Sequence, residues 1–398
     1  MLASALWGVS PAAAQGLDGT RAAEAEAARR AKAAALIEPD RNNIESVIHY
    51  LEESRLFPRL FNPPGGWFAQ IGGLGEGNGF TAGGGYRLPT PAGRLTMRAV
   101  GSLRQSYLVN AELTRDFLAR ESGFVTASVT QRHEAAQRYY GAGPDTPYED
   151  RSSFGLSATQ ADLTAGLRVT SWLMTSAGVG MLAPDVGASS ERGRVQDTAV
   201  RFTDLEGPGP SAQPTFATVH ATLRVDTRAT GNPRRGGLYS AQVRRFSDRD
   251  GGAYSFTATR LDLQHFVPFW NESRVLAFRV LAEHADGLGR AQVPFYLQPA
   301  LGGARSLRGY ERQRFRDHSL LLLSAEYRYE VTPFLMAAVF YDAGQVAPDF
   351  RAFRARDIRS DYGIGFRFGY SSAVALRSDL VLRGEDAVRL ILGFSSSF

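Results

Sequence analysis

The sequence of 398 residues contains no cysteine and a single lysine, Lys32, so its net charge of +5 comes almost wholly from arginine. Without cysteine there are no disulfides, no thiolate metal ligands and no cysteine nucleophile. No stretch approaches the roughly 18 consecutive apolar residues that a membrane-spanning helix needs. That absence excludes only helical membrane proteins, because membrane-spanning strands need about 9–11 residues and are apolar at alternate positions.

Signals for nucleic-acid binding and for catalysis are also weak. The arginines are spread over the whole chain with acids interleaved, and they form no basic block, so we expect no nucleic-acid partner. None of the six histidines lies in a metal-ligand spacing, and no G-x-S-x-G nucleophile motif occurs. The glycine-rich segments precede no predicted helix, so they are not phosphate loops. We therefore expect no enzymatic activity, no metal and no cofactor.

The first 64 residues differ from the rest. Residues 1–14 have an apolar stretch followed by Ala12, Ala13 and Ala14, which is typical of a signal peptide cleaved after Ala14. Residues 15–64 predict helices, first from an alanine-, glutamate- and arginine-rich composition and then from an apolar stripe at helical spacing between positions 44 and 51. We expect this segment to lie in the periplasm or to plug the lumen of the domain that begins at residue 65.

From Trp67 onward the apolar residues recur with a period of two. In 362–370 the even positions are bulky and apolar and the odd ones are glycine or arginine, and 276–283 alternates in the same way. One face of each strand is large and apolar, the other carries both signs of charge, and almost no helix is available to cover the apolar face. That combination predicts an all-β transmembrane barrel, apolar toward lipid and polar toward its lumen.

Counting gives sixteen antiparallel strands within residues 65–398, the even number that bacterial single-chain barrels require when both termini lie on the periplasmic side. The expected strands are 68–88, 93–104, 106–117, 123–133, 151–160, 162–171, 173–184, 215–226, 237–247, 254–267, 273–286, 317–330, 334–346, 359–370, 373–383 and 387–398. The last strand carries Phe394 and the terminal Phe398 on its apolar face. We interpret this aromatic end as a sorting signal of outer-membrane barrels.

The longest connection, about 287–316, joins the eleventh and twelfth strands and contains Arg308-Gly309-Tyr310. The period of two points Glu326 of the twelfth strand and Asp342 of the thirteenth into the lumen. We therefore expect the loop to fold inward and to be held by an arginine–carboxylate pair. Gly309 is expected to let the loop turn sharply against the wall.

This ordered set resembles the BamA/TamA superfamily of outer-membrane barrels, the bacterial surface antigen domain. In that family a loop-six R-G-[FY] motif locks onto acids of strands twelve and thirteen, and Arg308-Gly309-Tyr310, Glu326 and Phe340-x-Asp342-x-Gly344 match it. The resemblance implies an integral protein of a Gram-negative outer membrane that contacts lipid, a client polypeptide and a possible periplasmic partner. Residues 15–64 fit no periplasmic POTRA domain, so we expect a short form of the family.

The seam between the first and last strands is predicted to be weak. Glycines that include Gly77, Gly79 and Gly83 lie in the expected first strand, and Ser395 and Ser397 lie in the last. In the family this seam is the lateral gate for client strands; the alternative is relief of curvature where a barrel closes. The sequence thus predicts a barrel that assists insertion or translocation of polypeptides, with a passive channel or structural barrel as the alternative.

Overall fold

Long antiparallel strands make up most of the part of the chain that the structure describes. The computed structural model describes residues 60–398 except 75–76, 119–120, 192, 210, 229–232, 270, 333, 371–372, 386–387 and 394–398. The signal peptide expected over 1–14 and almost all of the helical segment expected over 15–64 lie outside the described residues. Residues 61–398 form one compact unit.

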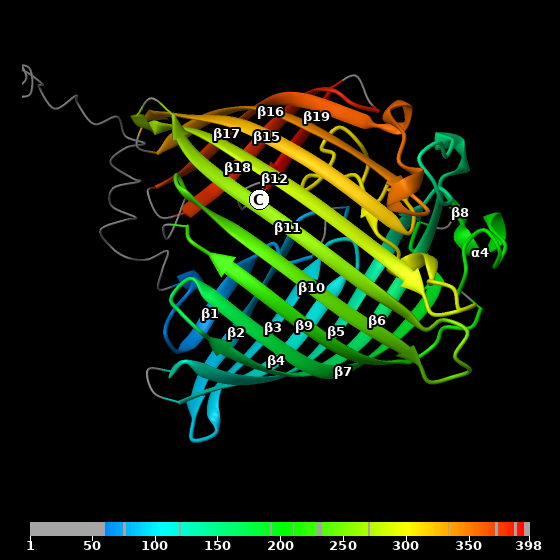
Figure 1. The fold of residues 1–398 in the computed structure, drawn as a ribbon, viewed down its shortest axis with the longest axis horizontal. Helices are drawn as coiled ribbons and strands as arrows, with labels where there is room; N and C mark the ends of the chain where they lie inside the picture. Colours follow the sequence, from blue (N-terminus) through cyan, green and yellow to red (C-terminus); the bar gives the residue numbers. More distant parts are fainter. Residues whose placement is uncertain are drawn as a thin grey trace, which may run out of the picture. The chain divides into compact units, whose positions relative to one another are not determined.

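Within the described residues, sixteen strands form the wall of this unit, each paired with the next. Figure 1 shows how these strands lie side by side. They are β1 (Gly66–Ile71), β2 (Thr81–Thr90), β3 (Gly93–Ser102), β4 (Tyr107–Phe117), β5 (Gly123–Tyr139), β6 (Ser152–Arg168), β7 (Leu173–Ala188), β9 (Phe216–Asp226), β10 (Gly236–Asp248), β11 (Phe256–Phe269), β12 (Asn271–Gly287), β15 (Ser319–Thr332), β16 (Leu335–Ala347), β17 (Arg359–Tyr370), β18 (Ala373–Arg383) and β19 (Arg389–Gly393).

All neighbouring strands of the wall are antiparallel and follow one another in chain order from β1 to β19. The short strand β8 (Gln196–Asp197) pairs with β6 in parallel. A separate two-stranded sheet, β13 (Ala300–Leu301) with β14 (Phe315–Arg316), lies within the connection between β12 and β15. The helical pieces are α4 (Thr198–Arg201), η3 (Tyr148–Asp150), η4 (Phe295–Leu297), η5 (Phe350–Ala352) and η6 (Ala355–Asp357).

The expected number of wall strands is confirmed, but the chain is divided into strands differently at two places. One expected strand is two strands, and two expected strands are one. The strand expected over 68–88 is two strands, β1 and β2, because the chain leaves the sheet at Gly72 and Gly73, whose φ angles are +79° and +108°. The strands expected over 151–160 and 162–171 are one continuous strand, β6. One error adds a strand and the other removes one, so the eleventh to sixteenth strands keep their expected positions in the strand order.

The two faces of the wall differ as the alternation predicts. On one face large apolar side chains are exposed, for example Val129, Leu163 and Met181, each more than half accessible. On the other face charged side chains are buried against the interior, for example Asp262 and Arg279. This second face is the lumenal one, because the long connection between β12 and β15 packs against it. In the part of the chain that the structure describes, no helix is long and apolar enough to cross a membrane.

The two ends of the wall are unlike. Long connections lie at one end, the longest being 189–215 and 288–318, whereas turns of a few residues, such as 91–92 and 169–172, lie at the other. The connection 288–318, called loop six below, fills the inside of the loop-bearing end. Its buried apolar residues form shared clusters with strands from both sides of the wall, and they are Val293, Phe295, Tyr296, Leu301, Leu307 and Phe315.

Candidate functional site

Arg308 of loop six lies in the lumen, buried to 2% exposure, and its guanidinium reaches three strands of the wall. Its Nε and Nη2 donate to the two carboxylate oxygens of Asp342 on β16, at 2.6 and 3.0 Å. Its Nη1 donates to Glu326 on β15 at 2.7 Å. The planar fork of an arginine matches a carboxylate in this bidentate way. The structure thus brings together the three charged residues that the sequence motif selects.

The other residues of the motif shape the space around this pair. The Phe340 ring lies beneath the guanidinium, with Cζ of Arg308 3.4 Å from the ring centroid, and supplies a cation–π contact. A Cβ on Gly344 would lie 2.8 Å from a main-chain oxygen and 3.1 Å from Leu301, so glycine at 344 leaves room for loop six. Tyr310 is half-buried and packs its ring 5.2 Å from that of Phe315.

Gly309 has a different role from the expected sharp turn. Its φ is not among the positive values of the chain, so the left-handed conformation is not what selects glycine there. A Cβ on Gly309 would lie 2.7 Å from Cα of Gly384, closer than real Cβ contacts come. Its N–H donates to Asp361 on β17 at 2.9 Å. Glycine is required because two backbones approach each other closely.

Sequence reasoning missed part of this network. Asp379 of β18 accepts from Arg308 at 3.4 Å, and Arg367 of β17 donates to both Asp379 and Glu326, at 2.5 and 3.2 Å. Arg377 of β18 donates to the main-chain oxygen of Ala304 in loop six at 2.8 Å. The sequence did contain a signal for these residues. They are charged, and the alternation along the two strands after the motif points them toward the lumen. The network therefore ties loop six to four strands, β15 to β18.

Loop six also closes the loop-bearing end with apolar packing. Phe295 is fully buried between Tyr139 and Phe154, with ring centroids 4.7 and 4.8 Å away. Val293 packs in a second cluster with the buried rings of Phe216 and Phe256. These partners come from β5, β6, β9 and β11, and other apolar residues of loop six pack with β12, β15 and β16, so the apolar part of the loop contacts widely separated strands of the wall. None of the motifs found in the sequence predicted these apolar contacts of loop six.

The connection between β5 and β6, residues 140–151, is fixed to loop six by Glu311. Tyr140 and Tyr148 donate to the two oxygens of Glu311, at 2.6 and 3.0 Å. Burial raises the pKa of Glu311, but the hydrogen bonds from these two tyrosines and the charges of Arg138 and Arg151 outweigh burial and hold that pKa below its ordinary value of 4.5. Glu311 is therefore ionised near neutral pH and binds the connection.

The seam residues expected from the sequence lie elsewhere in part. The pairings between described residues leave β1 and β19 as the two edges of the sheet. Gly83 lies in β2, paired with Gln70 of β1 and Val100 of β3, and Gly77 and Gly79 lie in the connection between β1 and β2. The placement of these three glycines on the seam edge is therefore wrong, because the chain turns after Ile71. Ser395, Ser397, Phe394 and Phe398 lie outside the described residues.

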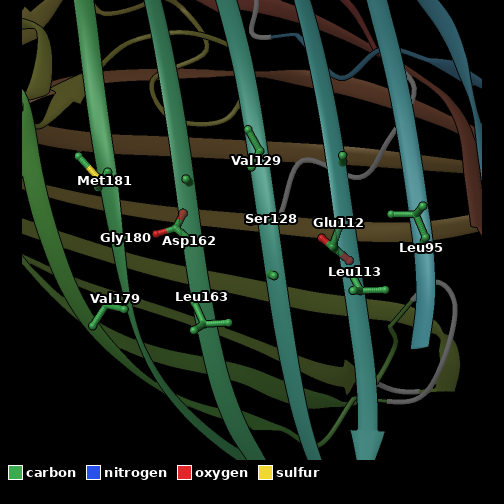
Figure 2. Close-up of a pocket in the computed structure, with 13 residues that line it drawn as sticks. Leu95, Glu112, Leu113, Ser128, Val129, Asp162, Leu163, Val179, Gly180 and Met181 are labelled. Carbon is green, nitrogen blue, oxygen red and sulfur yellow. The ribbon is translucent and has the colours of Figure 1, made fainter. Parts of the chain in front are cut away.

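One hollow lies on the outer face of the wall. It has a volume of about 550 Å³ and lies across β3 to β7, where Figure 2 shows Leu95, Leu113, Val129, Leu163, Val179 and Met181 around it. The intervening Asp162 belongs to the lumenal face, where it bonds Arg244. The hollow is an uneven stretch of apolar surface. Among the described residues no group of three or more acidic, histidine or cysteine side chains is placed to hold a metal ion.

Comparison with known proteins agrees with this architecture. No curated protein matches the chain. The structure of BamA from Haemophilus ducreyi lacking POTRA domains 1–3 superimposes with a TM-score of 0.61 at 14% identity, over 82% of this chain and 69% of that one. CdiB from Escherichia coli superimposes with a TM-score of 0.51 at 11% identity, over 82% of this chain and 61% of the other, so the chain spans less than two thirds of CdiB. At these identities the likeness concerns the fold.

A family model assigns the chain from its sequence. The Omp85 superfamily domain matches residues 121–380, which contain loop six, the arginine network and most of the wall. That match covers more than half of the chain and includes every residue of the motif at 308–344. The chain therefore belongs to the Omp85 superfamily, with a barrel of the BamA/TamA type.

Proposed function

We propose that this protein is an integral barrel of a Gram-negative outer membrane that assists the insertion or translocation of polypeptides through the seam between β1 and β19. The proposal rests on two features that occur together: loop six is tethered to the wall, and β1 and β19 are the edge strands of the sheet among the described residues. Arg308 fixes loop six to the wall, while among the described residues β1 pairs only with β2 and β19 only with β18. An unpaired edge presents N–H and C=O groups that an incoming strand can pair with.

The short paired length of β1 supports the same proposal. β1 pairs with β2 over six residues, whereas β5 and β6 pair over fifteen. Few ladder hydrogen bonds hold β1 against the wall, so an outward movement of β1 that opens the seam disturbs little of the wall. The lipid-facing apolar surface then lies beside the opening, where a client strand would enter the bilayer.

The alternative, a passive channel, is less well supported. A passive pore needs a continuous water path, and the apolar cluster of Phe295, Val293 and their partners lies across the loop-bearing end. Conductance through the purified barrel in planar bilayers measures this alternative directly. A steady open conductance comparable to that of a general porin would favour the channel.

The seam itself is tested with a covalent link. Because the chain has no cysteine, the double variant Ala69→Cys, Leu392→Cys places thiols only on the outward faces of β1 and β19, where a bismaleimide joins them. The matched control, Ala99→Cys with Val109→Cys, links a paired position of β3 and β4 that lies away from the seam. We expect the seam link to abolish insertion of an unfolded outer-membrane polypeptide into liposomes while the control keeps it. Equal rates in both linked proteins would contradict the proposal.

A further inference from the structure

A second arginine of loop six, Arg314, spans the mouth of the barrel. It is 5% exposed, and its Nη1 and Nη2 donate to the hydroxyl and to the main-chain oxygen of Thr146, each at 2.8 Å. Its Nε donates to a carboxylate oxygen of Glu385. Thr146 belongs to the connection between β5 and β6, and Glu385 belongs to the connection between β18 and β19. One guanidinium therefore holds two distant parts of the wall.

On the β5–β6 side the attachment is reinforced. The guanidinium of Arg314 lies over the ring of Tyr140, with Cζ 4.5 Å from the centroid. The N–H of Gly143 donates to the main-chain oxygen of Arg316 at 2.8 Å, which adds a backbone bridge between the connection and loop six. Arg359, the first residue of β17, donates to Asp145 at 2.5 Å and so joins the same connection to the wall directly. The 140–151 connection is thus held against loop six and against β17.

On the β18–β19 side the attachment is a close backbone contact. The N–H of Glu385 donates to the main-chain oxygen of Gly309 at 2.9 Å. A Cβ on Gly384 would lie 2.2 Å from that same oxygen, so the hairpin lies directly on the loop. Because Gly309 follows Arg308, the last hairpin rests on the buried arginine network. Glu385 is consequently fixed by its backbone and by its side chain.

The seam lies between these two attachments. β5 and β6 are the fifth and sixth strands counted from the β1 edge, and β18 and β19 are the last two strands at the other edge. We propose that Arg314 is a brace across the seam, which holds the walls on either side of it together at the loop-bearing end. Opening the seam at that end requires Arg314 to leave Thr146 or Glu385, and Arg359 to leave Asp145. Arg314 thereby controls the proposed lateral opening. This part of the inference rests on the proposed function.

A distance measurement in the absence of any client tests the brace. Spin labels at Glu149→Cys and Val388→Cys, both exposed and on opposite sides of the seam, report the separation of the two walls in the full-length barrel in lipid bilayers. We expect Arg314→Met to raise the population at longer distance about tenfold, as loss of charge-assisted hydrogen bonds of about 1.4 kcal/mol or more does. Glu385→Gln, which keeps the side-chain shape, should shift the population in the same direction by a smaller factor.

The control is Arg356→Met, which removes an exposed arginine at the same end of the barrel that pairs with its neighbour Asp357. We expect it to leave the distance distribution as in the unmodified chain. An unchanged distribution in Arg314→Met, or the same shift in Arg356→Met, would overturn the brace. Since no client is present, a barrel without insertion activity still gives a readable distance. A failure of the proposed function and a failure of the brace are therefore separate results.

Discussion

Replacing Arg308 by methionine is the most direct test of the loop-six tether. Glu326 keeps Arg328 at 2.8 Å and Arg367 at 3.2 Å, and Asp379 keeps Arg367 at 2.5 Å. Asp342 is different, because Arg308 is the one guanidinium within hydrogen-bond distance of it among the described residues. The substitution therefore leaves one buried carboxylate without a cation, and removing one partner of a buried pair costs about 3–5 kcal/mol.

The free energy of unfolding, measured by urea titration of the barrel in micelles, reports this cost. We expect Arg308→Met to lose about 3–5 kcal/mol. Adding Asp342→Asn removes the orphaned charge and should recover about 2 kcal/mol, since residues of one ion-pair network couple by amounts of this size. Arg305→Met changes an exposed arginine of the same loop and should stay within about 0.5 kcal/mol of the unmodified chain. A loss under about 1 kcal/mol, or strictly additive effects of the two substitutions, would refute the reasoning.

Three further results are expected. Gly309→Ala should cost about 1–3 kcal/mol through overlap with Gly384, while Gly101→Ala, where a Cβ meets nothing within 4 Å, should have little effect in the same unfolding assay. Phe295→Ala should cost about 3–5 kcal/mol and raise the conductance of the barrel, because it removes the centre of the apolar closure. Because the pKa of Glu311 is below 4.5, its stabilising contribution is complete above that pH and is lost as the pH falls. Heat-unfolding midpoints should therefore fall more steeply below pH 4.5 in the unmodified chain than in Glu311→Gln.

The tether was predictable from the sequence because its parts follow local rules. Glu326 and Asp342 occupy positions whose direction is fixed by the period of two along a strand, and Arg308 lies in the longest connection next to those strands. Asp379 and Arg367 lie equally well on the lumenal face, yet alternation alone does not say which lumenal charges meet. That depends on how far loop six reaches across the barrel.

The strand count shows how a correct total can contain compensating errors. In the sequence, alternation continues through the glycine-rich turn between β1 and β2, and it is weak within β6. The period of two therefore does not locate every turn. The Gly72 and Gly73 turn is set by positive φ angles, which the sequence permits without requiring. For the same reason alternation places the seam at Gly77, Gly79 and Gly83, whereas these glycines lie within or beside β2 rather than on the edge.

By itself the sequence determined that this chain is an all-β protein with an apolar outer face and a charged lumen, because side-chain alternation is a property of each strand alone. The motif at 308–344 also selected Arg308, Glu326 and Asp342, which hold part of loop six. Only the tertiary structure decided that, among the described residues, β1 pairs only with β2 and β19 only with β18, that aromatic residues of loop six pack against the wall at one end, and that Arg314 joins Thr146 to Glu385. The contacts of Arg314 join residues 71 and 168 positions apart in the chain. The position of the edge strands depends on which strands pair with which. These features depend on the closure of the whole wall, which no local pattern specifies.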